Sequence, residues 1–167
     1  KNPMMWKFWE PGIDYGNGFG EADHPLMRSS EAYLIAAEAI VKGASNGSVG
    51  SASDYYNAVV NRAVGGALAD ADMAANPTDL SSSATKSYRA SGNVTIEMIM
   101  DERAREFMGE GLRWYDLKRT GTLISRSKAF NPWIGALNYI KEHHYLRPIP
   151  LSEIDLATND VAQNPGY

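Results

Sequence analysis

The sequence predicts an all-α protein made of helical hairpins joined by long irregular loops. Apolar residues recur at helical spacing in four short segments between residues 29 and 119. Ser or Thr comes just before several of these segments, and Gly follows their ends, as helix termini prefer. Between the segments the chain is rich in Gly, Pro, Ser and Asn, which is typical of loops.

The composition excludes several classes of function. The chain has 167 residues and is 44% hydrophobic, enough for one domain with a core and against wholesale disorder. A net charge of −4 without a basic cluster disfavours nucleic-acid binding. Because there is no cysteine, disulfides, Cys-ligated zinc and a Cys nucleophile are excluded. No apolar run approaches the ~20 residues needed to span a bilayer.

Two helices are expected in the first half of the chain. The first runs from a cap at Ser29 or Ser30 to about Lys42, with Gly43 just beyond its end. One face of this helix carries Tyr33, Ala36, Ala37 and Ile40. The second is capped by Ser53, reaches about Val64 and is closed by Gly65-Gly66; its inner face carries Tyr56, Val59, Val60 and Ala63.

Joined by the loop at 43–51, these helices form an antiparallel hairpin, the unit from which tetratricopeptide-type solenoids are built. Such solenoids need several units to bury a continuous core, and only one is clear here. The first residues contain neither an initiating Met nor a secretion signal. We therefore expect this chain to be part of a longer protein, with further hairpins upstream.

The second half begins with a surface excursion over 67–92, biased to Ala, Ser, Asp and Asn. Thr95 is expected to cap a third helix, whose buried face carries Ile96, Ile99, Met100, Arg103 and Phe107. Gly109 and Gly111 predict a bend, and a fourth short helix over 112–119 ends at Gly121. Residues 122–147 give no clear pattern.

Near the C-terminus, Tyr145 to Pro150 is predicted to be extended, because proline disfavours helix at the residue before it. Ser152 is expected to cap a last helical turn, and Gln163 to Tyr167 to form a turn.

The run from Asp101 to Gly121 is the most informative part of the sequence. It surrounds Phe107, Trp114, Tyr115 and Leu117 with charged residues of both signs. The simplest interpretation is two short helices whose aromatic residues are buried and whose charges pair with each other. Asp101 and Arg105, for example, have the i,i+4 spacing of a helical ion pair.

Four blocks of the sequence together resemble one known family. They are Leu26 to Ala39, Asn57 to Ala63, Asp101 to Gly121 with its Asp-Leu-Lys-Arg-Thr-Gly ending, and Leu146 to Asp155 followed by Gln163 to Tyr167. In this order they are similar to the C-terminal part of the SusD/RagB family of outer-membrane nutrient-binding lipoproteins. Val60 departs from the family, which often has Arg at this position.

The resemblance implies a largely helical, non-catalytic protein. Residues 1–167 would be the C-terminal part of a SusD-like domain, with the N-terminal tetratricopeptide half and the lipid anchor outside this chain. Family members face outward from the outer membrane and bind oligosaccharides or sometimes peptides. They close over a SusC-like TonB-dependent transporter, so the implied partners are that transporter, a glycan and the N-terminal remainder of the same protein.

The carboxylates Asp101, Glu102, Glu106 and Glu110 raise the alternative of a glycoside hydrolase fragment, which needs two carboxyls ~5–9.5 Å apart across a cleft. Arginines among them would keep these acids ionised and disfavour a proton donor. We therefore predict no catalytic residue. We assign Arg103, Glu106, Arg113 and Asp116 to structural ion pairs and Phe107, Trp114, Tyr115 and Leu117 to the core.

No metal or cofactor is predicted. Glu142-His143-His144 gives only a weak metal pattern, because adjacent residues rarely converge on one ion. The acidic, Gly-rich stretch from Asp14 to Glu21 has Gly16 where the EF-hand template needs an oxygen ligand.

Sugar rings stack on exposed aromatic side chains, and polar groups bond their hydroxyls. We take aromatic residues beside Gly, Pro and Asn, expected in loops, as candidate ligand contacts: Trp6, Trp9, Tyr15, Trp133 and Tyr139. A helical-repeat scaffold that binds protein instead of sugar is a further alternative, and it predicts an apolar groove without an aromatic platform.

Overall fold

The computed structural model describes residues 7, 10, 12–13, 26–63, 89–90 and 92–167. In these ranges it has seven α-helices, one 3₁₀ helix and no β-strand, so the all-α prediction is confirmed. The elements are α1 (Ser29–Val41), α2 (Ala52–Ala63), α5 (Ile96–Glu106), α6 (Arg113–Arg119), α7 (Leu123–Phe130), α8 (Pro132–Leu137), η1 (Glu142–Tyr145) and α9 (Leu151–Leu156). The excursion predicted over 67–92 falls almost wholly outside the described residues.

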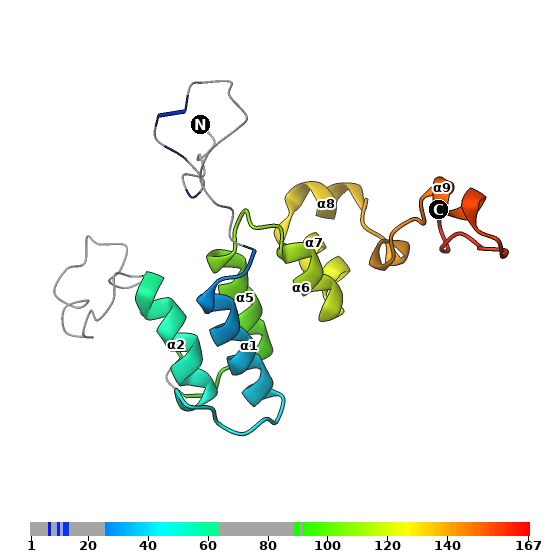
Figure 1. The fold of residues 1–167 in the computed structure, drawn as a ribbon. Helices are drawn as coiled ribbons and strands as arrows, with labels where there is room; N and C mark the ends of the chain where they lie inside the picture. The colour runs from blue at the N-terminus through cyan, green and yellow to red at the C-terminus, as the bar shows by residue number, and fades with distance from the viewer. Residues whose placement is uncertain (1–6, 8–9, 11, 14–25, 64–88, 91) are drawn as a thin grey trace. The chain divides into compact units, whose positions relative to one another are not determined.

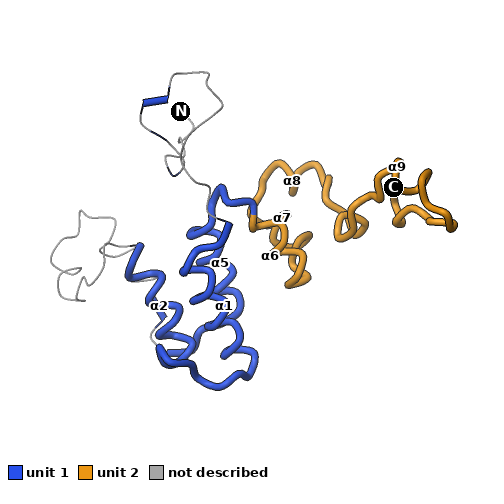
Figure 2. The backbone as a smooth tube through the Cα atoms, viewed as in Figure 1, with its two compact units in different colours: residues 1–111 blue, residues 112–167 orange. Residues whose placement is uncertain are grey.

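The chain forms two compact units, residues 1–111 and 112–167 (Figure 2). In unit 1, α1 and α2 form the predicted antiparallel hairpin, and α5 packs against both helices (Figure 1). The core of unit 1 is made by side chains of these three helices and the residue after α5: Leu34, Ala37, Tyr55, Tyr56, Val59, Val60, Ile99, Met100 and Phe107.

The buried face of α1 differs from the predicted one. Leu34 is completely buried and Glu38 nearly so, whereas Tyr33, Ala36 and Ile40 are only half-buried. The helix contacts both α2 and α5. The face of α1 that is most buried is therefore the one between these two helices, and not the face predicted from the spacing of apolar residues. In α2, Tyr56, Val59 and Val60 are buried as predicted, but Ala63 is exposed.

Of the three helix caps predicted in unit 1, two are wrong and one is confirmed. The residue that caps α1 is Arg28, in extended conformation and without a side-chain capping bond. Ahead of α2, the backbone N–H of Ser51 donates to Asp54 Oδ2 at 2.7 Å, so Ser53 lies inside the first turn. Thr95 caps α5 as predicted, accepting a bond from the Met98 N–H at 3.2 Å.

The predicted bend follows α5. Gly109 and Gly111 have φ angles of 83° and 77°, in the left-handed region that glycine adopts without steric cost. After this bend, α6 begins at Arg113 and ends before Gly121, which is also left-handed, at 67°.

Unit 2 has a small core of its own. Leu117, Leu123 and Ile140 are buried together, and Trp114, Ile124, Ile134 and Tyr145 pack against them. Tyr115 is 59% exposed, so its assignment to the core is wrong. Because Trp114 and Leu117 are three residues apart, they share the inner face of α6, and Tyr115 next to Trp114 is turned away from that face. Its ring lies 5.9 Å from the Arg147 guanidinium.

The C-terminal segment is extended from Leu146, not from Tyr145, which ends the 3₁₀ helix. The proline argument applies only to Arg147 and Ile149, the residues that directly precede proline. Likewise α9 begins at Leu151 without a side-chain cap, so Ser152 lies inside it. The predicted terminal turn is present, with the Tyr167 N–H bonded to the Asn164 carbonyl.

We predict that Leu34→Ala lowers the free energy of unfolding by about 2–5 kcal/mol, because Leu34 is 0% exposed and its removal leaves a cavity. Its neighbour Ile35, which is 46% exposed, gives a matched control. Ile35→Ala should change stability by only about 0.5 kcal/mol. Urea unfolding followed by circular dichroism measures both, and equal effects would contradict this description of the core.

Candidate functional site

The acidic end of α5 is held by basic side chains from distant parts of unit 1. Arg28 Nη1 lies 2.6 Å from Glu106 Oε1, and Arg28 Nη2 lies 2.8 Å from Glu110 Oε1. Arg62 from α2 also pairs with Glu106, and Lys7 pairs with Glu110. The two carboxylates therefore join the start of α1 and the end of α2 to the end of α5.

Burial makes these pairs important to unit 1. The side chains of Glu106 and Glu110 are each 6% exposed, so an unpaired charge at either position would be costly. Hydrogen bonding to Glu110 raises the pKa of Arg28, which burial alone would lower. Burial alone would raise the pKa of Glu110, but bonds to Arg28 and Lys7 outweigh it and lower that pKa overall.

A second set of contacts surrounds the Phe107 ring. The guanidinium carbons of Arg28 and Arg103 lie 5.1 and 5.0 Å from its centroid, within the range of cation–π attraction. Arg103, buried to 4% exposure, is 3.2 Å from Glu31 of α1. The helices α1 and α5 are thus joined by charged and aromatic contacts together.

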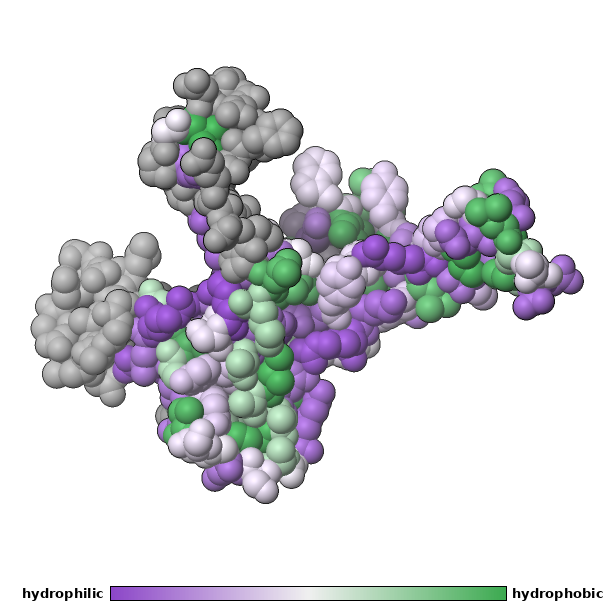
Figure 3. Space-filling model, in the orientation of Figure 1, coloured by the Kyte–Doolittle hydropathy of each residue, from purple (hydrophilic) through white to green (hydrophobic). Residues whose placement is uncertain are grey.

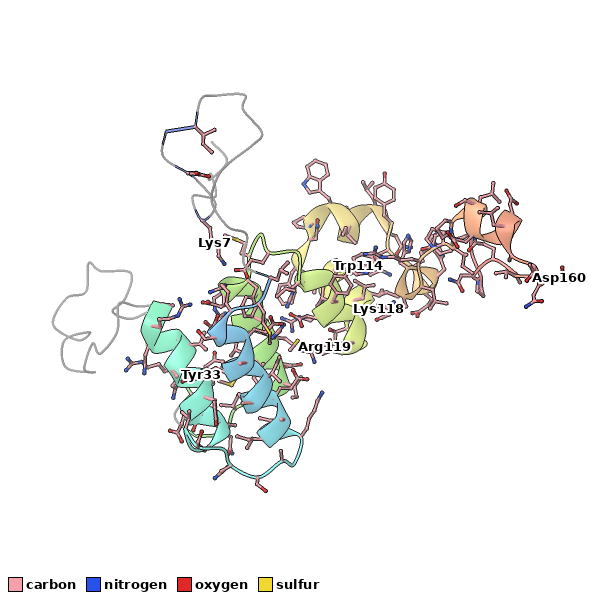
Figure 4. All side chains as sticks on the ribbon, in the orientation of Figure 1. Lys7, Tyr33, Trp114, Lys118, Arg119 and Asp160 are labelled. Carbon is pink, nitrogen blue, oxygen red and sulfur yellow. The ribbon has the colours of Figure 1, made fainter. Side chains whose placement is uncertain are left out.

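The structure places the other predicted scaffold residues in α6. Asp116 is buried and pairs with Arg119 at 3.1 Å, while Arg113 is the half-buried first residue of the helix. Trp114 and Arg119 are labelled in Figure 4. These residues belong to unit 2.

The carboxylates of the central run lie among cations. Glu102 bonds Arg105 at 2.6 Å, and Glu106 and Glu110 have the partners described above. A general acid needs a carboxyl that stays protonated, whereas cationic partners favour the ionised form. This arrangement favours a structural role for these three acids over proton transfer.

The aromatic candidates in unit 2 lie on the surface. Trp133 is 78% exposed and Tyr139 is 68% exposed. Trp133 lies in α8 and not in a loop as predicted; Asn131 caps this helix by accepting bonds from the N–H groups of residues 133 and 134. Asn138, which ends α8, is left-handed with φ 49°. Trp6, Trp9 and Tyr15 lie outside the described residues.

Phe130, 71% exposed, is a further aromatic side chain that the sequence argument missed. It immediately precedes Asn131-Pro132, so the rule that selected Trp133 also applies to it. The Arg126 guanidinium lies 5.0 Å from the centre of its ring. Three exposed aromatic side chains therefore occur between residues 130 and 139.

The outward face of α1 is also apolar. Figure 3 shows apolar side chains along this helix, where Ile35 is 46% exposed and Ala32 and Ala39 are exposed. Just before the helix, Leu26 and Met27 are 92% and 63% exposed. Small residues at this spacing let a second helix approach closely.

The described residues contain no group of three or more His, Asp or Glu side chains placed to hold a metal ion. The rings of His143 and His144 lie 4.1 Å apart, and His143 packs edge-on against Tyr167. The stretch from Asp14 to Glu21 lies outside the described residues. None of the described helices is long and apolar enough to cross a bilayer.

The family assignment rests on the whole sequence. Residues 2–167 match the model of the SusD family. The chain belongs to the SusD family. The match takes in both compact units, so the ion pairs of unit 1 and the exposed aromatic side chains of unit 2 are both parts of a SusD-family chain.

Three curated proteins show similar identity to this SusD-family chain. The starch-binding protein SusD of Bacteroides thetaiotaomicron is 32% identical over 151 residues, which cover 89% of this chain and 22% of that protein. The SusD-like proteins P25 and P2 of Formosa agariphila are 31% and 30% identical, over 99% of this chain and 29% and 30% of theirs. This chain thus spans less than a third of their length. No solved structure shows a significant match.

We predict that Glu106→Gln lowers the free energy of unfolding by about 3–5 kcal/mol, because it removes the charge that Arg28 and Arg62 share. Glu97→Gln, on the exposed first turn of the same helix, removes an equal charge as a control and should cost about 1 kcal/mol or less. Urea unfolding compares the two variants. A loss no larger for Glu106→Gln than for Glu97→Gln would exclude a stabilising role for this network.

The lowered pKa of Glu110 predicts a pH dependence of stability. Above the ordinary carboxyl pKa of 4.5, the ion pairs of Glu110 make their full contribution to the free energy of unfolding. This contribution is lost as the pH falls through the lower pKa that Glu110 has in the folded state. Unfolding free energies of the parent chain should therefore decline below about pH 5. Glu110→Gln should be less stable at neutral pH and decline less steeply; parallel pH curves for the two proteins would count against this pairing.

Proposed function

We propose that this chain is the C-terminal part of a cell-surface protein that binds a glycan and delivers it, uncleaved, to a SusC-like TonB-dependent transporter. The match to the SusD family over residues 2–167 is the observation that carries the proposal. The name of one relative, starch-binding protein SusD, supports a carbohydrate as ligand. The cationic partners of Glu102, Glu106 and Glu110 favour binding over hydrolysis.

In this proposal, Trp133 and Tyr139 are sugar contacts. Each offers a large apolar ring to solvent, and a pyranose ring can stack on such a surface. Trp133 is fixed to α8, whose first turn Asn131 caps. A ring on a capped helix loses little conformational freedom on binding, which favours affinity. Trp6, Trp9 and Tyr15 are proposed as further contacts.

The remainder of the protein is a further proposed partner. The exposed apolar face of α1 around Ile35 offers a contact surface for another helical hairpin of the same chain. Relatives more than three times as long as this chain have room for several such hairpins. The lipid anchor that holds the protein on the outer membrane, facing outward, would belong to that remainder.

A binding assay and an assay for reducing-sugar release, on the same polysaccharides, test the function. We expect the chain to be retained on at least one glycan without releasing sugar from it. Release of reducing sugar would support the hydrolase alternative. Retention by proteins but by no glycan would support the helical-repeat scaffold.

We predict that Trp133→Ala weakens binding to the retained glycan by up to about tenfold, because an aromatic stacking contact is worth about 0.5–1.5 kcal/mol. Leu156→Ala in α9, which removes an apolar side chain 80% exposed, is the control and should bind as the parent does. Isothermal titration calorimetry measures both. Since Trp133 is exposed, neither variant should change the melting temperature, and unchanged affinity in Trp133→Ala would remove it from the site.

A further inference from the structure

Unit 1 contains a pocket whose described lining does not include Trp133 or Tyr139. It has a volume of about 250 Å³ and lies where the first turns of α1 meet the last turns of α2. Its lining residues are Ser29, Ser30, Tyr33, Ala58, Val59 and Arg62. This is slightly below the ~300 Å³ at which pockets for drug-sized ligands begin, so one small ring suits it better than a long chain.

One part of the lining is apolar and rigid. Ala58 and Val59 lie on α2, and Val59 is a buried core residue. Tyr33 (labelled in Figure 4) packs edge-on against Tyr55, with ring centroids 5.6 Å apart, which restricts its orientation. An aromatic ring beside aliphatic side chains is a surface on which the apolar face of a sugar can stack.

Another part of the lining is cationic. Arg62 bonds Glu106 through Nη2, and its side chain is 57% exposed. Among the described contacts, Nε and Nη1 of Arg62 have no acceptor, so both can donate charge-assisted hydrogen bonds to an anion. Arg62 shares the Glu106 carboxylate with Arg28, so this one acid is divided between two guanidinium groups.

The start of α1 also favours an anionic ligand. Its capping residue, Arg28, makes no side-chain bond to the N–H groups of the first turn, and this turn carries the positive end of the helix dipole. Ser30, 5% exposed, lines the pocket, and its Oγ has no hydrogen-bond partner. The acid in this turn, Glu31, is paired with Arg103 and is thus partly neutralised.

We propose that this pocket binds a small ring that carries a carboxylate, with the carboxylate on Arg62 and Ser30 and the ring against Tyr33 and Val59. Resting on the glycan binding proposed above, the ring is a uronic acid unit of an acidic glycan. The chain would then take charged as well as neutral sugars.

The test compares methyl glucuronide with methyl glucoside, two probes that differ only in the carboxylate, by titration under NMR with the 167-residue chain. We expect the glucuronide to bind more tightly and to shift the resonances of residues 29–33 and 58–62. Its affinity should fall as salt is added, because part of the attraction is between exposed charges. Equal affinity for the two probes would overturn the proposal.

Ser29→Glu is the variant of choice. It places a carboxylate at the mouth of the pocket while leaving the bond between Arg62 and Glu106 intact, and an acid in the first turn stabilises a helix. We expect glucuronide binding to weaken about tenfold or more without loss of melting temperature, since hydrogen bonds to charged groups are strong. Ser45→Glu, in the exposed loop at the other end of the hairpin, is the control with equal net charge.

The outcomes separate this inference from the proposed function. If a neutral glycan binds through Trp133 but the glucuronide does not bind, or binds equally to Ser29→Glu and Ser45→Glu, the pocket proposal alone is wrong. If the glucuronide binds and Trp133→Ala leaves that binding unchanged, the two sites are distinct. If no carbohydrate binds, both proposals are wrong.

Discussion

The contact of Arg28 with Glu106 and Glu110 is the constraint on which unit 1 depends. One guanidinium bonds two nearly buried carboxylates, so the start of α1 is fixed to the end of α5. Arg62 brings α2 to the same point. Each member of this network is needed by the others, because any buried charge left without its partner would be strongly unfavourable. The hydrophobic core of Leu34, Tyr56 and Ile99 gives the three helices affinity for each other, and the charges define their register.

The same network explains why the sequence places acidic and basic residues together around the end of α5. Glu106 and Glu110 are engaged by arginine and lysine in unit 1, whereas the exposed aromatic side chains of Phe130, Trp133 and Tyr139 lie in unit 2. Each unit has its own core. Substitutions of exposed residues in one unit should therefore leave the stability of the other unit unchanged.

Much of unit 1 could be predicted from local rules. Thr95, Gly43 and the glycines at 109 and 111 have sequence signals whose physical basis is local, and all were interpreted correctly. The buried line of α1 could not be predicted, because it depends on α5, which lies more than fifty residues away in sequence. The partners of Glu106 and Glu110 also come from residues far away in sequence, between 44 and 82 positions for Arg62 and Arg28. The helices α7 and α8 were missed, because they are short and few of their residues are buried. The exposure of Tyr115 was also missed.

The C-terminal tail has a consequence for solubility. The side-chain amide of Gln163 accepts from the Ile149 N–H at 2.7 Å and donates to the Ile149 carbonyl at 2.8 Å, as an adjacent β-strand would. Asn164 and Tyr167 bond the carbonyls of Arg147 and Leu146 in the same segment. An extended stretch with open backbone groups is a template for edge-to-edge association between molecules. The tail covers these groups within one molecule and so protects the segment from aggregation.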